Sequence, residues 1–328
     1  MLRMIITLTL VMLMSPGAWA ICTIARGQPT QLAIGSQLIT ISADAPIDKV
    51  IPIAQYDSPI IGNGIGYDDC LNGTEYGKRV MDLSGQDADT RIYATNIAGI
   101  GIKLLFSNGS AFGNFPSTSV LSFPNGELKG TLDFPGQSFY RIQFFKIGNL
   151  RLNNTAGDTI LPAGKIAYNY IMNDNPASYS TSLTIGEIKI ISTPTCTTDG
   201  SKTVDFNTVT PSLLAAGVTR NLDFSIVCKS DYGSYSTKAS MVTNTPSSNG
   251  SSIRIEDAAG NNDRMEIQIT DGLDNLMKVD GTTLEHKSST TSQGPAEFSW
   301  KAKLISGAKA SPAGGVFSAK AEIVFDIQ

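Results

Sequence analysis

The last twelve residues carry the most regular pattern of the chain, and this pattern limits how the chain can fold. From Phe317 to Gln328 the odd-numbered residues are all apolar, and the even-numbered ones are polar except Val324. Successive side chains of a β-strand point to opposite faces, so the alternation predicts a strand with one apolar face. Chain ends usually fray, whereas this end can bury its apolar face only by pairing with a partner. The residues of that face are Phe317, Ala319, Ala321, Ile323, Phe325 and Ile327.

The first twenty residues have the features of a secretory signal peptide. Arg3 supplies a positive charge, an apolar stretch runs from Met4 to Met14, and Ala18-Trp19-Ala20 offers the small residues of a cleavage site. A membrane anchor is the alternative, but the apolar stretch is shorter than the roughly 20 residues that cross a bilayer. We therefore expect residues 1–20 to be removed and the exported chain to begin at Ile21.

Four cysteines follow the predicted cleavage site: Cys22, Cys70, Cys196 and Cys228. An even number of cysteines in an exported protein predicts disulfides. Of the three possible connectivities we favour the local one, Cys22 with Cys70 and Cys196 with Cys228, because it gives each half of the chain one bridge. A metal site is the alternative, but no two cysteines are close in sequence and the chain has a single histidine. No metal or cofactor is expected.

Short alternating stretches, separated by turn-forming residues, extend along the whole chain. Asn-Gly, Asp-Gly and Pro-Gly pairs mark the turns, and no stretch keeps a helical period over three turns. Many strands at this spacing predict antiparallel sandwiches or barrels, so the chain is expected to be all-β. The predicted strands include Leu38–Ser42, Ile92–Ala94, Ile102–Phe106, Phe139–Ile147, Ile166–Ile171, Ile185–Ile191, Val204–Phe206, Leu222–Cys228, Ile253–Ile255, Met265–Ile269 and Phe298–Leu304.

Ser192-Thr-Pro-Thr195 interrupts this rhythm just before Cys196. The chain has 328 residues, enough for two domains, and the two favoured cysteine pairs separate on either side of this segment. We predict a first domain over residues 21–191, a linker at 192–195 and a second domain over 196–328.

From Cys196 onward the chain resembles a fimbrial subunit (pilin) domain. The resemblance rests on Cys196, Val204-Asp-Phe206, Leu222–Cys228, Met265–Ile269 and the terminal strand, in this order. It implies an immunoglobulin-like or jelly-roll-type sandwich that lacks its last strand, which leaves a hydrophobic groove and unpaired sheet edges. A periplasmic chaperone, and then the N-terminal extension of the next subunit, would complete it by β-strand addition. The apolar face of the last twelve residues would form one edge of that groove; the alternative is an ordinary strand of a complete sandwich.

A polymerising pilin carries a donor segment of roughly a dozen residues before its first cysteine. Here a whole predicted domain precedes Cys196, and in the exported chain only Ile21 precedes Cys22. Such a subunit can accept a donor strand but cannot give one, which predicts a position at the tip of a fimbrium.

Residues 21–191 resemble the receptor-binding domains of fimbrial tip adhesins, most closely the type 3 fimbrial adhesins. The resemblance rests on Ile92–Phe106 and on the junction Ile188–Cys196. It is weaker to the mannose-binding type 1 adhesins, because Gly73 follows Asn72 where an acidic residue is expected. The two halves together imply a two-domain tip adhesin with a second sandwich domain at the N-terminus.

A lectin-like site needs polar side chains beside an aromatic face, on loops at one end of a sandwich. Three segments meet this requirement, and for each the alternative is an ordinary turn or a solvated strand face. The candidate ligand-binding residues are Tyr67, Asp68, Asp69 and Asn72 around Cys70, then Tyr140 and Arg141, and finally Asn173 and Asp174.

The formal net charge is −4 and no basic patch stands out, which argues against nucleic acid as a partner. No catalytic motif surrounds the acidic residues or His286, so an enzyme is not expected. The sequence predicts a fimbrial tip adhesin, exported through the periplasm, that attaches a bacterium to a host glycan or an extracellular-matrix protein. Its expected partners are the periplasmic chaperone, the outer-membrane usher and the next fimbrial subunit. The alternatives are a non-adhesive tip or adaptor subunit and, from a different class, a secreted carbohydrate-active enzyme.

Overall fold

The computed structural model describes residues 22–172, 176–307 and 311–328. The predicted signal peptide with Ile21, and the candidate ligand residues Asn173 and Asp174, lie outside the described residues. The chain divides into two compact units. Of the described residues, unit 1 contains 22–39, 47–149 and 159–189, and unit 2 contains 40–46, 150–158 and 190–328. The all-β class predicted from the sequence is confirmed for both units.

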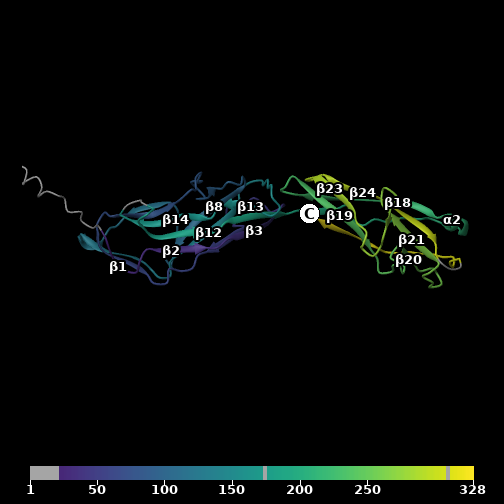
Figure 1. Cartoon of the computed structure of the whole chain (residues 1–328), viewed down its shortest axis with the longest axis horizontal. Coiled ribbons are helices and arrows are strands. Elements are labelled where there is room, and N and C mark those ends of the chain that lie inside the picture. Colours follow the sequence, from purple (N-terminus) through teal and green to yellow (C-terminus); the bar gives the residue numbers. More distant parts are fainter. Residues whose placement is uncertain (1–21, 173–175, 308–310) are drawn as a thin grey trace, which may run out of the picture. The chain divides into compact units, whose positions relative to one another are not determined.

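Unit 1 is built mainly from three sheets (Figure 1). The first consists, in order, of β10 (Ser117–Val120), β6 (Glu75–Val80), β14 (Gly164–Ile171), β15 (Tyr179–Ile185) and β2 (Thr30–Ile34). The second consists of β4 (Ala54–Asp57), β12 (Phe139–Lys146), β8 (Ile100–Ser107) and β7 (Tyr93–Ala94), with β9 (Phe112–Asn114) paired to β8. The third consists of β1 (Thr23–Arg26), β5 (Ile65–Leu71) and β11 (Lys129–Phe134). The remaining elements of the first half are β3 (Gln37–Ser42), β13 (Asp158–Leu161), β16 (Ile188–Thr193) and a single 3-10 turn, η1 (Pro124–Gly126).

Alternation along β12 separates the core of unit 1 from its surface. Tyr140, Ile142 and Phe144 are fully buried, whereas Phe139 and Arg141 on the opposite face remain partly exposed. β8 pairs with β12 antiparallel and in register, and its even-numbered residues are also buried. Because side chains alternate along a strand, the odd-numbered residues in the middle of these two strands lie on the outer face of the sheet.

Unit 2 contains two antiparallel sheets and one short helix. The larger sheet consists, in order, of β17 (Thr195–Thr198), β18 (Val218–Lys229), β24 (Pro295–Ser306), β21 (Met265–Thr270) and β20 (Ile253–Ile255), with β22 (Leu276–Met277) paired to β21. The smaller sheet consists of β23 (Glu285–Thr291), β19 (Ser234–Val242) and β25 (Glu322–Ile327). Helix α2 (Pro211–Ala216) begins after Thr210, whose side chain accepts the Leu213 N–H, and lies at the end of unit 2 away from the C-terminus (Figure 1). Among the residues described, no helix is long and apolar enough to cross a membrane.

The two sheets of unit 2 enclose an aromatic core. Trp300 of β24 is fully buried, and its indole N–H donates to the Glu285 carboxylate. The rings of Phe224 and Phe298 stack at 5.0 Å, and Phe325 of β25 lies 5.9 Å from each of them. Since β25 joins this core only by pairing with β19, the C-terminal strand contributes directly to the stability of unit 2.

Three predicted strands differ from the structure. The terminal strand begins at Glu322 rather than at Phe317, and Val204–Phe206 is not in a strand. The predicted strand Ile185–Ile191 is in fact two strands, because β15 ends at Ile185 and β16 begins at Ile188, and between them the Gly186 N–H donates to the Ile34 carbonyl. A side chain at Gly186 would collide with Ser36, so only glycine fits this position.

Candidate functional site

A groove of about 1330 Å³ lies between the two sheets of unit 2. One side is formed by residues 198–209, which follow β17 and are called the N-terminal rim below. The other side is formed by residues 315–323, the C-terminal rim, which lead into β25. The floor is apolar and combines residues of both sheets: Leu222, Phe224, Met241, Ile253, Ile267, Ile269 and Ala302.

Both rims have an unpaired backbone. Within the described ranges, no backbone–backbone hydrogen bond reaches residues 200–206 of the N-terminal rim or residues 315–319 of the C-terminal rim. The strands next to the rims, β17 and β25, are each at the edge of their sheet. Unpaired N–H and C=O groups at a sheet edge are a template for another strand. The groove therefore has the shape and the backbone groups to receive an extended peptide.

The predicted C-terminal edge lies on this groove. Phe317, Ala319, Ala321, Ile323 and Phe325 all line it, whereas Ile327 lies beyond it and packs against the core. The strand itself is shorter than predicted, because among the described residues no strand lies beside 317–321 to pair with them. Val316, also on this rim, is 93% exposed, so an apolar side chain stands open beside the groove.

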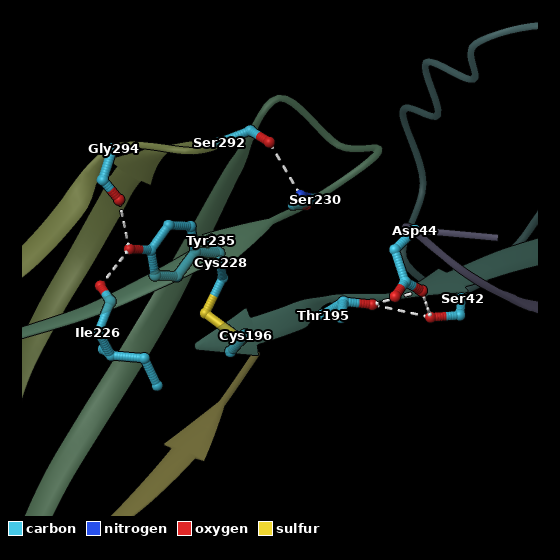
Figure 2. The surroundings of a disulfide bond; sticks show 10 residues. All are labelled: Ser42, Asp44, Thr195, Cys196, Ile226, Cys228, Ser230, Tyr235, Ser292 and Gly294. Carbon is cyan, nitrogen blue, oxygen red and sulfur yellow. Dashed lines mark hydrogen bonds between the residues drawn. A yellow bond between two sulfur atoms is a disulfide. The ribbon is translucent and has the colours of Figure 1, made fainter. Parts of the chain in front are cut away.

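A disulfide fixes the start of the N-terminal rim. Cys196 of β17 is bonded to Cys228 of β18, and the two strands pair at this position (Figure 2). The Tyr235 hydroxyl lies 2.9 Å from the Ile226 carbonyl oxygen and 2.6 Å from that of Gly294, which ties β19 to the same region. The N-terminal rim thus begins next to a part of the larger sheet that the disulfide holds in place.

The groove is lined by groups that bind a partner through apolar contact rather than by reactive side chains. Its floor carries no titratable side chain, and the rim pair Lys202–Asp199, at 2.7 Å, is satisfied within the rim. In the part of the chain that the structure describes, no group of three His, Cys, Asp or Glu side chains is placed to hold a metal ion.

In unit 1, the first predicted ligand segment is only partly accessible. Asp68, Asp69 and Asn72 are exposed, and Cys70 is bonded to Cys22. Tyr67 is 5% exposed and packs edge to face on Phe134, with centroids 6.3 Å apart. The aromatic face expected beside these polar groups is therefore buried, and Tyr67 is not available to a ligand.

Tyr140 is also buried, so its predicted role in ligand contact is corrected to a structural one. Its hydroxyl lies 2.9 Å from the Thr181 hydroxyl and accepts the Asn169 side-chain N–H at 3.0 Å. Burial raises the pKa of the Tyr140 hydroxyl far above its ordinary value. This network joins β12 of the second sheet to β14 and β15 of the first.

Arg141, in contrast, belongs to an accessible cluster that the sequence did not reveal. Its Nε and Nη2 donate to the two carboxylate oxygens of Asp57, both at 2.7 Å. The guanidinium lies 4.5 Å from the ring centroid of Phe112, which is 44% exposed, and 5.8 Å from that of Phe139. We call these four residues the Arg141 cluster. Its members come from β4, β9 and β12, and only the pairing of strands distant in sequence brings them together.

Two family models match the chain, and together they cover residues 31–328. The fimbrial protein model matches residues 184–328, which include the groove, and the MrkD-like receptor-binding domain model matches residues 31–185. This chain is a two-domain fimbrial adhesin. The predicted resemblance to the type 3 fimbrial adhesins is confirmed, and fimbrial proteins of these families are structural and binding proteins.

Several solved structures resemble the adhesin. The receptor-binding domain of the plasmid-born adhesin MrkD1P of Klebsiella pneumoniae is 18% identical over 56% of this chain and 98% of its own, with a TM-score of 0.38. The CupB6 tip adhesin of Pseudomonas aeruginosa is 13% identical over 93% of this chain and 94% of its own, with a TM-score of 0.35. A chain of the chaperone–tip adhesion subunit complex CsuC–CsuE of Acinetobacter baumannii is 11% identical over 93% of this chain and 99% of its own, with a TM-score of 0.42. The search of curated proteins gave no match.

Proposed function

We propose that this fimbrial adhesin occupies the tip of a fimbrium and is held there by a donor strand that binds in the groove of unit 2. The observation that carries the proposal is the groove itself, with an apolar floor and two rims whose backbones are unpaired. An extended segment would satisfy both rims through main-chain hydrogen bonds and place alternate side chains on the floor. The occupant is the N-terminal extension of the next fimbrial subunit.

Before assembly the same groove has to be covered, because an apolar groove with open sheet edges invites aggregation. A periplasmic chaperone that lends a strand meets this need during export, and the outer-membrane usher is the place where the donor strand replaces it. We assign this route to the adhesin because both steps use one groove and the same backbone groups.

The tip position is supported by the N-terminal strands. β1 pairs with β5, β2 pairs with β15, and Cys22 is bonded to Cys70. Residues 23–34 are thus largely engaged within unit 1, and none of these strands is free to complete another subunit. A subunit that accepts a strand without giving one ends the fibre.

For the receptor we propose the Arg141 cluster as the contact point, with Asp68, Asp69 and Asn72 as further exposed polar groups of unit 1. The bidentate bond to Asp57 holds the guanidinium still, so binding does not have to order it. Nη1 of Arg141 has no hydrogen bond to any described residue, and the exposed ring of Phe112 lies beside it. A fixed donor beside an exposed aromatic ring suits a host glycan or an extracellular-matrix protein. The adhesin therefore binds its receptor and does not transform it.

The groove is tested with the full exported chain and a synthetic peptide. Trp19 and Trp300 are the two tryptophans of the sequence, so after signal-peptide removal Trp300 alone reports on unit 2. A peptide of about twelve residues with alternating Val and Thr should raise the urea midpoint measured by Trp300 fluorescence. A peptide of the same composition with the alternation scrambled is the control. An equal midpoint with both peptides would refute donor-strand binding.

The receptor proposal is tested on arrays of glycans and matrix proteins. Arg141→Ala should abolish binding to the spots that the unmodified adhesin recognises. Arg26→Ala is the matched control, because Arg26 also bonds an aspartate, Asp133 at 2.8 Å, and no aromatic ring of the described residues lies against its guanidinium. Loss of binding in both variants, or in neither, rejects the cluster. Failure of the unmodified adhesin to bind any spot favours a non-adhesive adaptor subunit.

A further inference from the structure

Side-chain hydrogen bonds hold the chain at two places, one just before the C-terminal rim of the groove (residues 315–323) and one at Lys320 within it. At the first place, the Arg264 guanidinium donates to the Ser311 carbonyl at 3.2 Å, and the Ala313 N–H donates to Asp257 Oδ2 at 3.0 Å. At the second place, the Thr243 hydroxyl donates to the Lys320 carbonyl at 2.8 Å. Over the described residues, no backbone–backbone hydrogen bond reaches 314–319. This stretch faces the groove and carries the backbone groups that a donor strand would use.

Asp257 connects this rim to a tight turn between β20 and β21. Its Oδ1 accepts the backbone N–H groups of Ala259 and Asn261, both at 2.9 Å, and the Asn261 side-chain amide donates to it at 3.0 Å. The Asp257 residue is 4% exposed, so the carboxylate is inside the turn and not on its surface. The rim also packs on this turn, because a Cβ at Gly315 would lie 2.6 Å from the Ala258 Cβ.

We propose that Asp257 is a positioning residue of the groove, which fixes the C-terminal rim in the extended conformation that an incoming donor strand requires. The inference rests on the proposed function of the groove. A segment that is ordered before binding loses less conformational freedom when the partner arrives, so the partner binds more tightly. Oδ1 of Asp257 accepts only from the turn, whereas Oδ2 accepts both the Asn261 side-chain amide at 3.1 Å and the Ala313 N–H, so one carboxylate ties the turn to the chain that leads into the rim.

The chain contains a matched control for this role. Asp271 makes the same turn four residues before Asn275: its Oδ1 accepts the N–H groups of Leu273 and Asn275 at 2.9 and 2.8 Å, and its Oδ2 accepts the Asn275 amide. Among the residues described, its carboxylate forms no hydrogen bond to either rim. Loss of the Asp271 carboxylate therefore weakens a turn of the same construction in unit 2 without releasing the groove.

The experiment measures binding of the fluorescently labelled Val/Thr peptide to the full exported chain by anisotropy. In Asp257→Asn the new amide group can take two orientations. In one, its N–H₂ faces the Ala313 N–H, which then has no acceptor; in the other, the turn loses an acceptor. We expect peptide affinity to fall about ten-fold in Asp257→Asn, the loss of about one buried charge-assisted hydrogen bond, and to change less than two-fold in Asp271→Asn. A second variant, Ala313→Pro, removes the rim donor and keeps the carboxylate, and should weaken binding as Asp257→Asn does.

The urea midpoint of each variant, followed by Trp300 fluorescence without peptide, separates positioning from general destabilisation. The proposal holds when both aspartate variants lose similar stability and only Asp257→Asn loses peptide affinity. Equal peptide affinity in Asp257→Asn and Asp271→Asn overturns it. Absence of peptide binding to the unmodified chain overturns the proposed function, and the inference with it, whereas normal binding that Asp257→Asn leaves unchanged overturns the inference alone.

Discussion

The rings of Phe224 and Phe325 meet edge to face, with centroids 5.9 Å apart and planes inclined by 65°. Phe224 belongs to the larger sheet of unit 2 and Phe325 to the smaller one, and both line the groove. The same ring that closes the core thus forms part of the surface on which a donor strand would lie. The C-terminal strand thus serves both the stability of unit 2 and the donor-strand binding that we propose.

Phe325→Ala should therefore destabilise unit 2 even when no partner is present. We expect the free energy of unfolding to fall by about 2 kcal/mol, less than for a fully buried phenylalanine, because the groove leaves this ring partly exposed. The measurement is urea unfolding followed by Trp300 fluorescence. Val324→Ala is the control, since Val324 is 46% exposed on the other face of the strand. A similar loss in both variants would contradict the role of the Phe224–Phe325 contact.

The disulfide of unit 2 closes a loop between residues 32 positions apart. Loss of that constraint on the unfolded chain should lower the free energy of unfolding by about 4 kcal/mol in the double variant Cys196→Ala, Cys228→Ala. Trp300 fluorescence measures the change. Peptide mapping without reductant should show Cys196 linked to Cys228 and Cys22 linked to Cys70. A peptide that joins Cys70 to Cys196 would contradict this arrangement of the bridges.

Tyr140→Phe distinguishes a structural tyrosine from one that contacts a receptor. Removal of the hydroxyl leaves Thr181 and Asn169 with fewer partners in a buried site, at an expected cost of about 1–3 kcal/mol. Thermal unfolding followed by near-ultraviolet circular dichroism measures this loss. Receptor binding on the arrays should persist below the unfolding temperature. Selective loss of binding with unchanged stability would restore Tyr140 as a ligand contact.

The strands that the sequence predicted correctly are those whose partners lie within the chain. Alternation located β20, and most of β12 and β14, because their apolar faces are buried on neighbouring strands. The two predicted strands that are absent, Val204–Phe206 and the first part of Phe317–Gln328, lie on the two rims of the groove. Both have the pattern of a strand and lack a neighbour to pair with. Both segments line the groove in which we propose that a donor strand binds.

The Arg141 cluster, our proposed receptor contact, was harder to predict than the groove. An alternating pattern records which face of a strand is apolar, so it identified the C-terminal edge residues by number. The Arg141 cluster depends instead on the register of β12 against β4 and on the pairing of β9 with β8. Nothing in the local sequence around Phe112 or Asp57 indicates that they meet Arg141. The same limit explains Tyr67 and Tyr140, whose local composition suggested exposure although the sheets bury them.

Acid should reduce the stability that the Asp257 carboxylate gives to the folded chain, and the pKa of this carboxyl sets the direction of the effect. The backbone N–H of Ala313, followed by that of Asn261, lowers the pKa of the Asp257 carboxyl well below its ordinary value of 3.8. The unfolded chain therefore takes up this proton first as the pH falls. The stability that the carboxylate contributes is complete above about pH 4 and is lost as the pH drops toward the lower pKa of the folded state.

Urea midpoints of Trp300 fluorescence between pH 7 and pH 2.5 measure this loss. The difference between the unmodified chain and Asp257→Asn should be constant from pH 7 to about pH 5 and shrink below pH 4. A difference that stays constant over the whole range would show that Asp257 does not hold the rim through its charge.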